Sequence, residues 1–219
     1  MATEISFEVG KKRVFAWVHN WPGWCRAGRT EELAMEALAA YLPRYRVVTD
    51  EAGLKLPAQA AKDFQVVDRV PGNATTDFGA PGMVAPSDER KVTPAQAKRL
   101  AALLEAAWAV FDRAVTAAPA ELRKGPRGGG RDRDKMAQHV LSAEAGYARM
   151  IGLKLPEPRL GDRAAIAALR KEVLGVLGTA SDGAPLRPKG WPQRYAVRRF
   201  AWHVLDHVWE MEDRSEPAT

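Results

Sequence analysis

The chain has little cysteine and no long hydrophobic run. Cys25 is its only cysteine among 219 residues, which excludes an internal disulfide framework and fits a reducing compartment. No stretch approaches the roughly 18 consecutive apolar residues that a membrane span needs. The first residues, MATEISFEVGKKRV, lack the hydrophobic core of a signal peptide. We therefore expect a cytoplasmic protein with no membrane partner.

The charge balance is basic, with 33 lysines and arginines against 27 aspartates and glutamates and a formal net charge of +6. A positive balance can attract nucleic acid, anionic lipid or an acidic small substrate, and by itself it selects none of them. The densest basic cluster, LRKGPRGGGRDRDK at 122–135, is interrupted by acids and glycines. A solvated basic surface is the simpler interpretation, so nucleic acid is not an expected partner.

The first 70 residues carry strand patterns around one amphipathic helix. Apolar residues alternate over 5–9 and again over 13–21, and the turn between them predicts a β-hairpin. Thr30 stands where it can cap a helix over 31–41. A further strand is expected at 64–70, which gives the order β-β-α-β.

Prolines interrupt this pattern at two places. Pro43 is expected to stop the helix over 31–41. The segment 71–91 has three prolines and no sustained period, so it is interpreted as a linker or as an ordered crossing loop.

Everything after Thr93 has helical periodicity. Thr93 and Asp162 stand at positions where they can cap helices, and Pro94 and Pro192 suit first helical turns. Four helices are expected, at about 94–118, 132–151, 163–177 and 192–213. The sequence therefore predicts an α+β protein, with a small β-β-α-β domain over residues 1–86 and a four-helix bundle over residues 87–219.

Three of the four histidines lie in the predicted bundle. His203 and His207 are four residues apart, so an α-helix places both imidazoles on one face. His139 lies midway along another predicted helix, and bundles build metal sites from facing helices. Three neutral imidazoles leave at least one coordination position open, which is the form of a catalytic metal site. A chance pair on a solvated helix face, or a structural metal, remains an alternative.

Two charged residues near these histidines are candidate catalytic groups. Glu210 lies one turn beyond His207 and can serve as a fourth ligand or accept a hydrogen bond from an imidazole N–H. Arg199 lies one turn before His203 on the same face, where it can hold a substrate carboxylate or extend to solvent.

The joint order of these features resembles the DinB-like, or DinB/YfiT, superfamily of four-helix metalloproteins. The resemblance rests on Trp108 in a long first helix, on His139 followed by Glu144 in QHVLSAEAGYARMIG, and on the closing HVLDH of 203–207. It covers about 125 residues, and it implies that His139, His203 and His207 bind a divalent ion such as zinc or nickel. Unlike most members of that superfamily, this chain carries about 90 residues before the first helix of the bundle.

The front segment has a resemblance of its own. The run NWPGWCRAGRTEELAMEALAAYL at 20–42 is similar to the HicB-like pattern of a strand, a Pro-Gly turn and an amphipathic helix. HicB proteins are antitoxins that pair with a small RNA-cleaving toxin and commonly carry a separate DNA-binding segment. No such segment is legible in this sequence.

The leading functional hypothesis is a metal-dependent enzyme whose three-histidine site activates a thiol or a water. Likeness to the DinB-like superfamily suggests a transferase that uses a low-molecular-weight thiol as co-substrate and a small-molecule electrophile. The alternative is a non-catalytic, HicB-like antitoxin or regulatory protein in which the bundle serves to form a homodimer. The sequence leaves the metal, the electrophile and the oligomeric state open.

Overall fold

The alternating residues near the N-terminus form the predicted hairpin. In the computed structural model, which describes residues 2–124 and 130–215, strand β1 (Thr3–Val9) pairs antiparallel with β2 (Val14–Val18). All five residues of β2 are buried, so both faces of the hairpin are covered by other parts of the chain.

Two more strands complete the sheet, in the order β3-β2-β1-β4. Strand β4 (Phe64–Pro71), which the sequence predicts, runs parallel to β1, and β3 (Cys25–Gly28) runs antiparallel to β2. Strand β3 was not predicted, because its four residues after the Pro-Gly turn carry no alternating pattern of their own. Gly23 has φ +91°, and this tight turn reverses the chain and lets the sheet continue.

Two helices follow β3 where the sequence predicted one. Thr30 caps α1 (Glu31–Ala40) as predicted, and its Oγ1 accepts a hydrogen bond of 3.2 Å from the backbone N–H of Leu33. Pro43 does not simply end this helix, because it lies in the first turn of a second helix, α2 (Leu42–Glu51), where its missing N–H costs nothing. The front segment therefore has the order β-β-β-α-α-β rather than β-β-α-β.

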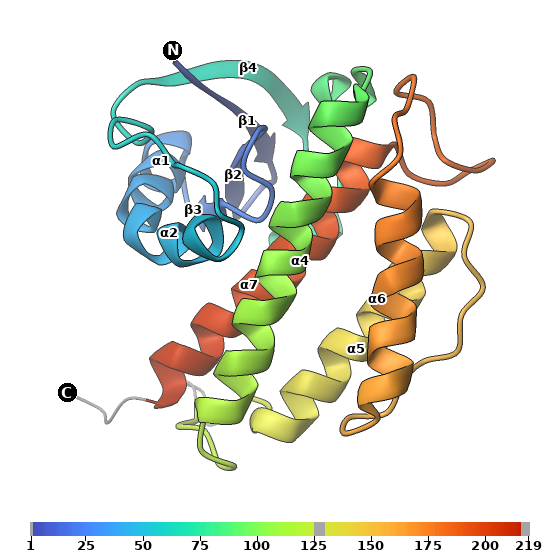
Figure 1. Ribbon diagram of the computed structural model, residues 1–219. Coiled ribbons are helices and arrows are strands. Elements are labelled where there is room, and N and C mark those ends of the chain that lie inside the picture. The colour runs from blue at the N-terminus through green and yellow to red at the C-terminus, as the bar shows by residue number, and fades with distance from the viewer. Residues whose placement is uncertain (1, 125–129, 216–219) are drawn as a thin grey trace.

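Four long helices make up the rest of the chain, as predicted (Figure 1). They are α4 (Pro94–Ala117), α5 (Arg133–Met150), α6 (Arg163–Leu177) and α7 (Gln193–Ser215). The side chains of Thr93 and Asp162 cap α4 and α6, as the sequence predicted. Helix α7 packs against both α4 and α5, and its central part is buried on nearly every side. The middle of the basic cluster, residues 125–129, lies outside the described residues.

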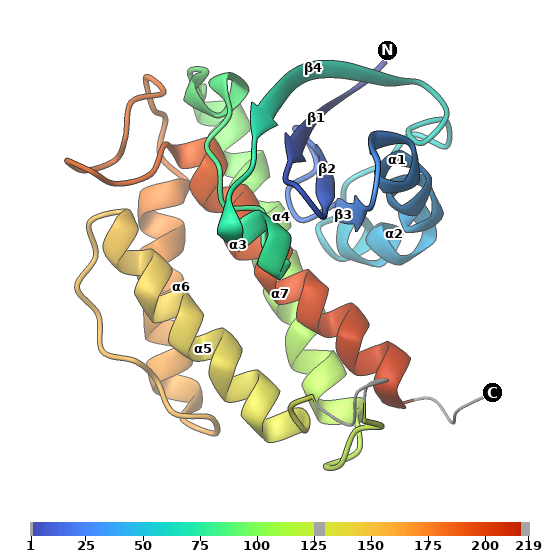
Figure 2. The same cartoon turned by 180° about the vertical axis from the view of Figure 1, so that it is seen from behind.

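The proline-rich segment 71–91 is the ordered crossing loop and contains α3 (Ala74–Phe78) and a short 3-10 helix, η1 (Pro86–Glu89). Buried Glu8 of β1 holds it, accepting hydrogen bonds from Thr76 Oγ1 at 2.5 Å and from the backbone N–H groups of Gly82 and Met83 at 3.0 and 2.9 Å. The segment then crosses α7, as Figure 2 shows. It thus connects the sheet to the last helix, because Gly82 and Met83 donate to Glu8 through their N–H groups and accept hydrogen bonds from α7 at their carbonyls.

The sheet and the long helices share apolar packing. One cluster of buried side chains runs from Phe7 and Leu38 through Tyr45 to Leu104 and Leu205. The domain boundary predicted between residues 86 and 87 falls within η1 and stays a prediction. Among the described residues, no helix combines the length and the apolar character that crossing a membrane requires.

Candidate metal centre

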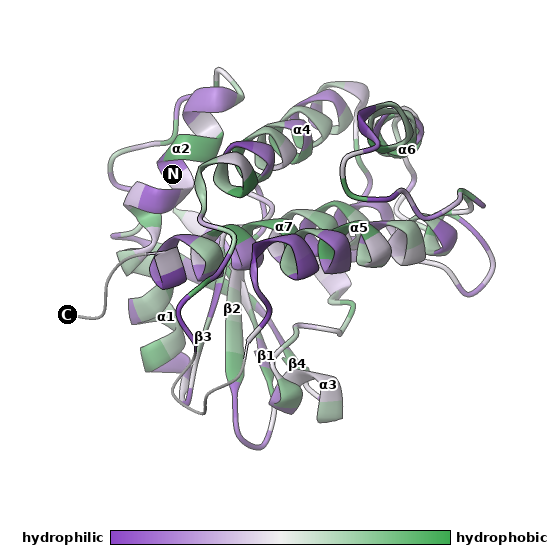
Figure 3. Ribbon diagram, turned by 90° about the horizontal axis from the view of Figure 1, so that it is seen from below, coloured by the Kyte–Doolittle hydropathy of each residue, from purple (hydrophilic) through white to green (hydrophobic). Residues whose placement is uncertain are grey.

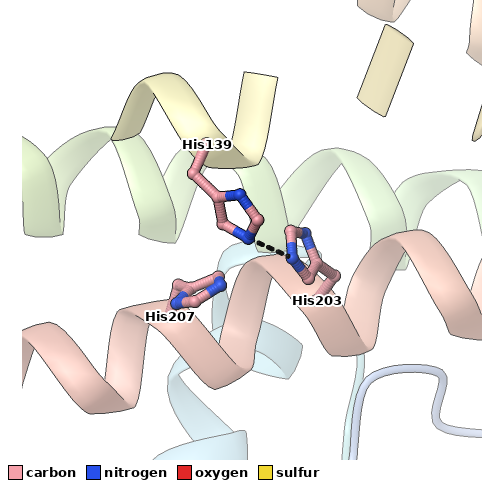
Figure 4. Close-up of side chains that lie close together, drawn as sticks. All are labelled: His139, His203 and His207. Carbon is pink, nitrogen blue, oxygen red and sulfur yellow. Dashed lines mark hydrogen bonds between the residues drawn. The ribbon is translucent and has the colours of Figure 1, made fainter. Parts of the chain in front are cut away.

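The three histidines expected to converge do so, between α5 and α7. His203 and His207 project from one face of α7, and His139 projects toward them from α5 (Figure 4). The ring centroids of His203 and His207 lie 4.8 Å apart, and the ring of His139 lies 5.1 and 5.2 Å from them. We call these three residues the histidine cluster.

The nitrogen atoms of the histidine cluster lie at distances that suit a shared ion. Nε2 of His139 and Nε2 of His203 are 3.3 Å apart. Two nitrogen ligands at about 2.0–2.1 Å from a tetrahedral ion lie about 3.3–3.4 Å from each other. One nitrogen from each of the three rings lies within 4.8 Å of the others, so small side-chain rotations would bring all three to a common ion. The 3.3 Å contact also suits a hydrogen bond between two neutral rings.

Burial favours the neutral form of two imidazoles of the cluster, those of His139 and His203. His203 is almost fully buried, and this burial, together with the neighbouring His207 and His139, lowers its pKa well below the usual value. Burial also lowers the pKa of the half-buried His139, and the positive charge of Arg131 acts in the same direction. Neutral imidazole is the form that can coordinate a metal, so these rings are ready to do so near neutral pH.

Glu210 takes the position of a hydrogen-bond partner to an imidazole. Its Oε2 lies 3.0 Å from Nδ1 of His207, and its Oε1 accepts a hydrogen bond of 2.8 Å from Arg214. The hydrogen bond from His207 holds the pKa of Glu210 below its usual value. A carboxylate bound at Nδ1 fixes the ring orientation and leaves Nε2 of His207 for the cluster.

One nitrogen in the cluster lacks a partner. Nδ1 of His203 is buried, and no described residue forms a hydrogen bond with it. An unpartnered buried polar atom is costly, and such atoms in native structures call for a functional or solvent explanation. The three imidazoles, with their short mutual distances and the unpartnered buried nitrogen of His203, therefore fit a nitrogen-bound divalent ion.

Arg199 lies beside the cluster but is already engaged. Its Nη1 donates a hydrogen bond of 2.7 Å to the carbonyl of Pro81, and its guanidinium lies 4.8 Å from the ring of Trp202 and 5.4 Å from that of Tyr147. Tyr147, whose ring centroid is 5.7 Å from that of His203, also lies at the cluster and was not predicted from the sequence. Its position eight residues after His139, about two helical turns, was the available signal.

The fourth histidine has a different environment. His19 follows β2 directly, and its Nε2 lies 2.7 Å from Oγ of Ser6 and 3.4 Å from Oγ of Ser87. Burial lowers its pKa to about 4. Its Nε2 is engaged by serine hydroxyls within the protein, which fits a structural role.

Comparison of the chain with models of protein families, with curated proteins and with solved structures gives no match. The resemblances to the DinB-like superfamily and to the HicB-like pattern therefore stay predictions from the motifs. Function has to be inferred from the geometry of the histidine cluster itself.

Proposed function

We propose that this chain is a metal-dependent enzyme whose histidine cluster holds one divalent ion, zinc or nickel. The observation that carries the proposal is the convergence of three imidazole nitrogens within 4.8 Å of one another, from two helices. Three neutral nitrogen ligands leave a coordination position open, and this favours a catalytic over a structural site. His139 is half-buried, so the cluster retains a side that a small molecule can approach.

The activity that we propose is transfer of a low-molecular-weight thiol to a small electrophile, with hydrolysis as the related alternative. A divalent ion at this position supplies the Lewis acid that makes a thiol or a water nucleophilic near neutral pH. The likeness of the helical half to four-helix proteins of the DinB-like superfamily supports the thiol as co-substrate.

The protein's own side chains would orient the metal ligands and neutralise negative charge on a substrate. Glu210 holds the imidazole of His207 through Nδ1, and Arg214 holds Glu210 in turn. The guanidinium of Arg199 supplies positive charge one helical turn from His203, where it would attract an anionic group of a substrate. The aromatic rings of Tyr147 and Trp202 limit the water around this part of the site.

The test is metal analysis of the purified full-length chain followed by turnover assays. We expect about one zinc or nickel per chain, and consumption of thiol with at least one member of a panel of electrophiles. Removal of the ion by a chelator should abolish turnover, and addition of the ion should restore it. A chain that binds neither metal, or that keeps its turnover after chelation, would contradict the proposal.

Chelation and variants together distinguish a structural ion from a catalytic one. If the ion is structural, chelation should lower the unfolding temperature of the chain and no thiol or water reaction should appear. His203→Ala should lose metal and turnover together, whereas His19→Gln should keep both, because His19 contacts serines rather than the cluster.

A further inference from the structure

A basic hollow lies at the end of the sheet where the β1–β2 turn meets β3 and α3. Figure 3 shows α3 at the same end of the sheet as this turn. The hollow has a volume of about 1220 Å³. Its principal charged and aromatic lining residues are Lys12, Arg13, Arg26, Arg29, Asp77 and Phe78.

The positive charges of the basic hollow are largely uncompensated. Lys12, Arg13 and Arg29 are exposed, and none of them forms an ion pair with a residue in 2–124 or 130–215. Arg26 is paired, at 3.1 Å, with Asp206 of α7. The carboxylate of Asp77 accepts a hydrogen bond of 2.8 Å from the backbone N–H of Lys12. The fold therefore concentrates a positive surplus at one concave surface.

An aromatic ring stands at the same surface. Phe78 is 89% exposed, the most exposed of the large apolar side chains in the described part of the chain. Exposing a ring of this size forgoes the free energy of burial, and here the ring lines the same hollow as the three cations.

The exposure of Phe78 is a fixed feature of the fold. The helix α3 that carries it begins with a capping box formed by Asn73 and Thr76. Thr76 is in turn bound to the buried carboxylate of Glu8. Gly79, with φ +129°, ends the helix immediately after Phe78. Because the backbone that carries the ring is fixed beforehand, binding of a ligand needs to order only the side chain of Phe78.

We propose that the basic hollow binds a nucleotide unit, in which an anionic phosphate is joined to an aromatic base. The phosphate would contact Lys12, Arg13 and Arg29, and the base would stack on Phe78. An inorganic anion would use the cations but not the ring, and an apolar ligand would use the ring but not the cations. The unit can come from a free nucleotide or from a single-stranded nucleic acid. This site is separate from the histidine cluster and does not depend on the metal.

The test measures binding of a short fluorescein-labelled single-stranded oligonucleotide to the full-length chain by fluorescence anisotropy, with adenosine monophosphate as competitor. Phe78→Ala should weaken binding roughly 5- to 150-fold, which is the range for loss of one stacked base. Lys12→Gln and Arg29→Gln should each reduce the slope of log affinity against log salt concentration by about 1. The matched controls, Leu160→Ala and Lys154→Gln, alter an exposed apolar and an exposed basic residue outside the hollow and should bind as the parent does.

Competition by the mononucleotide would assign the site to a free nucleotide. Binding of the oligonucleotide without such competition would assign it to single-stranded nucleic acid. Both outcomes support the proposal. Absence of binding to both probes would overturn it. So would unchanged affinity in Phe78→Ala, or equal affinity for polyglutamate, because each would leave only a nonspecific basic surface. His203→Ala should bind the probes normally, so failure of the metal proposal would be distinguishable from failure of this one.

Discussion

Two groups of largely buried polar side chains in this molecule differ in how their hydrogen-bonding atoms are satisfied. One is the histidine cluster between α5 and α7. The other group joins the sheet to η1 and α7. We call it the junction cluster, and it consists of Ser6, His19, Asp68, Ser87, Asp88 and Arg198. In the junction cluster Ser6 lies 2.7 Å from His19 and donates to Asp68 at 3.2 Å, so hydroxyl, imidazole and carboxylate satisfy one another.

The histidine cluster has no such internal complement. Nε2 of His203 faces another imidazole, and Nδ1 of the same ring has no partner among the described residues. Among those residues, Glu210 is the one carboxylate that is hydrogen-bonded to a ring of the cluster, that of His207. Polar groups that form hydrogen bonds with one another stabilise the fold. Nitrogen lone pairs that converge without hydrogen-bond donors are instead available to bind a ligand. The comparison predicts that changes in the junction cluster affect stability and that changes in the histidine cluster affect metal affinity.

The largest effect is expected from Asp88→Ala in the junction cluster. Asp88 and Arg198 are both buried, and three hydrogen bonds of 2.9, 3.2 and 2.7 Å join them. Removal of the carboxylate leaves a buried guanidinium uncompensated, so the free energy of unfolding should fall by roughly 3–5 kcal/mol. Urea unfolding measures this change, with Asp50→Ala as the control at an exposed position. Metal affinity at a temperature where the variant is folded should be unchanged; a loss would couple the two clusters and break the comparison.

The second prediction assigns unequal roles to the histidines. His139→Ala, His203→Ala and His207→Ala should each weaken zinc or nickel binding by roughly 100-fold or more, because supporting residues alone typically contribute 10–100-fold. His19→Ala should bind metal as the parent does. Metal titration with a competing chelator provides the affinities. Tight binding by His203→Ala, or loss of binding by His19→Ala, would show that the ion site lies elsewhere.

Local signals made much of the fold predictable. Capping threonine and aspartate residues before apolar-periodic runs located the starts of α4 and α6, because such side chains satisfy the free N–H groups of a first turn. The strand β3 was missed because four residues after a Pro-Gly turn carry no alternating pattern of their own. Pro43 was misinterpreted because proline is tolerated in a first helical turn as well as just after a last one.

The convergence of the three histidines was more predictable than the surroundings of the cluster. A spacing of four on a helix fixes the relative direction of His203 and His207, whereas the approach of His139 depends on how α5 packs on α7. The basic hollow was not predictable, because Lys12, Arg29 and Phe78 are far apart in the chain and only the sheet topology brings them together. Charges that look scattered in a sequence can form one surface in the fold.

A third prediction uses the titration of His19 to sharpen the contrast. Burial lowers the folded-state pKa of His19 from 6.5 to about 4, against opposing effects of Asp88 and Asp68. A base with a lowered folded pKa contributes stability that is present above the unfolded pKa and is lost as pH falls from 6.5 through 4. Between pH 7 and pH 4 the free energy of unfolding of the parent should therefore fall by roughly 2–3 kcal/mol more than that of His19→Gln. The comparison isolates His19 because the nearby carboxylates titrate in both proteins. Urea unfolding at the two pH values measures the difference; equal losses would mean that His19 is not buried in its neutral form.

The smallest effect should come from Glu210→Gln, which tests whether this residue supports the metal site or belongs to it. The amide keeps the length of the side chain, and its oxygen can still accept a hydrogen bond from Nδ1 of His207, but the charge is lost. If Glu210 only orients His207, metal affinity should fall about 10-fold, the lower end of the range for such supporting groups. The ion pair with Arg214 is partly exposed, so the free energy of unfolding should change by no more than about 1 kcal/mol. Glu172→Gln, at an exposed position on α6, is the matched control and should change neither quantity. A loss as large as that of His203→Ala would instead make Glu210 a fourth ligand, because only a directly coordinating group carries that much of the affinity.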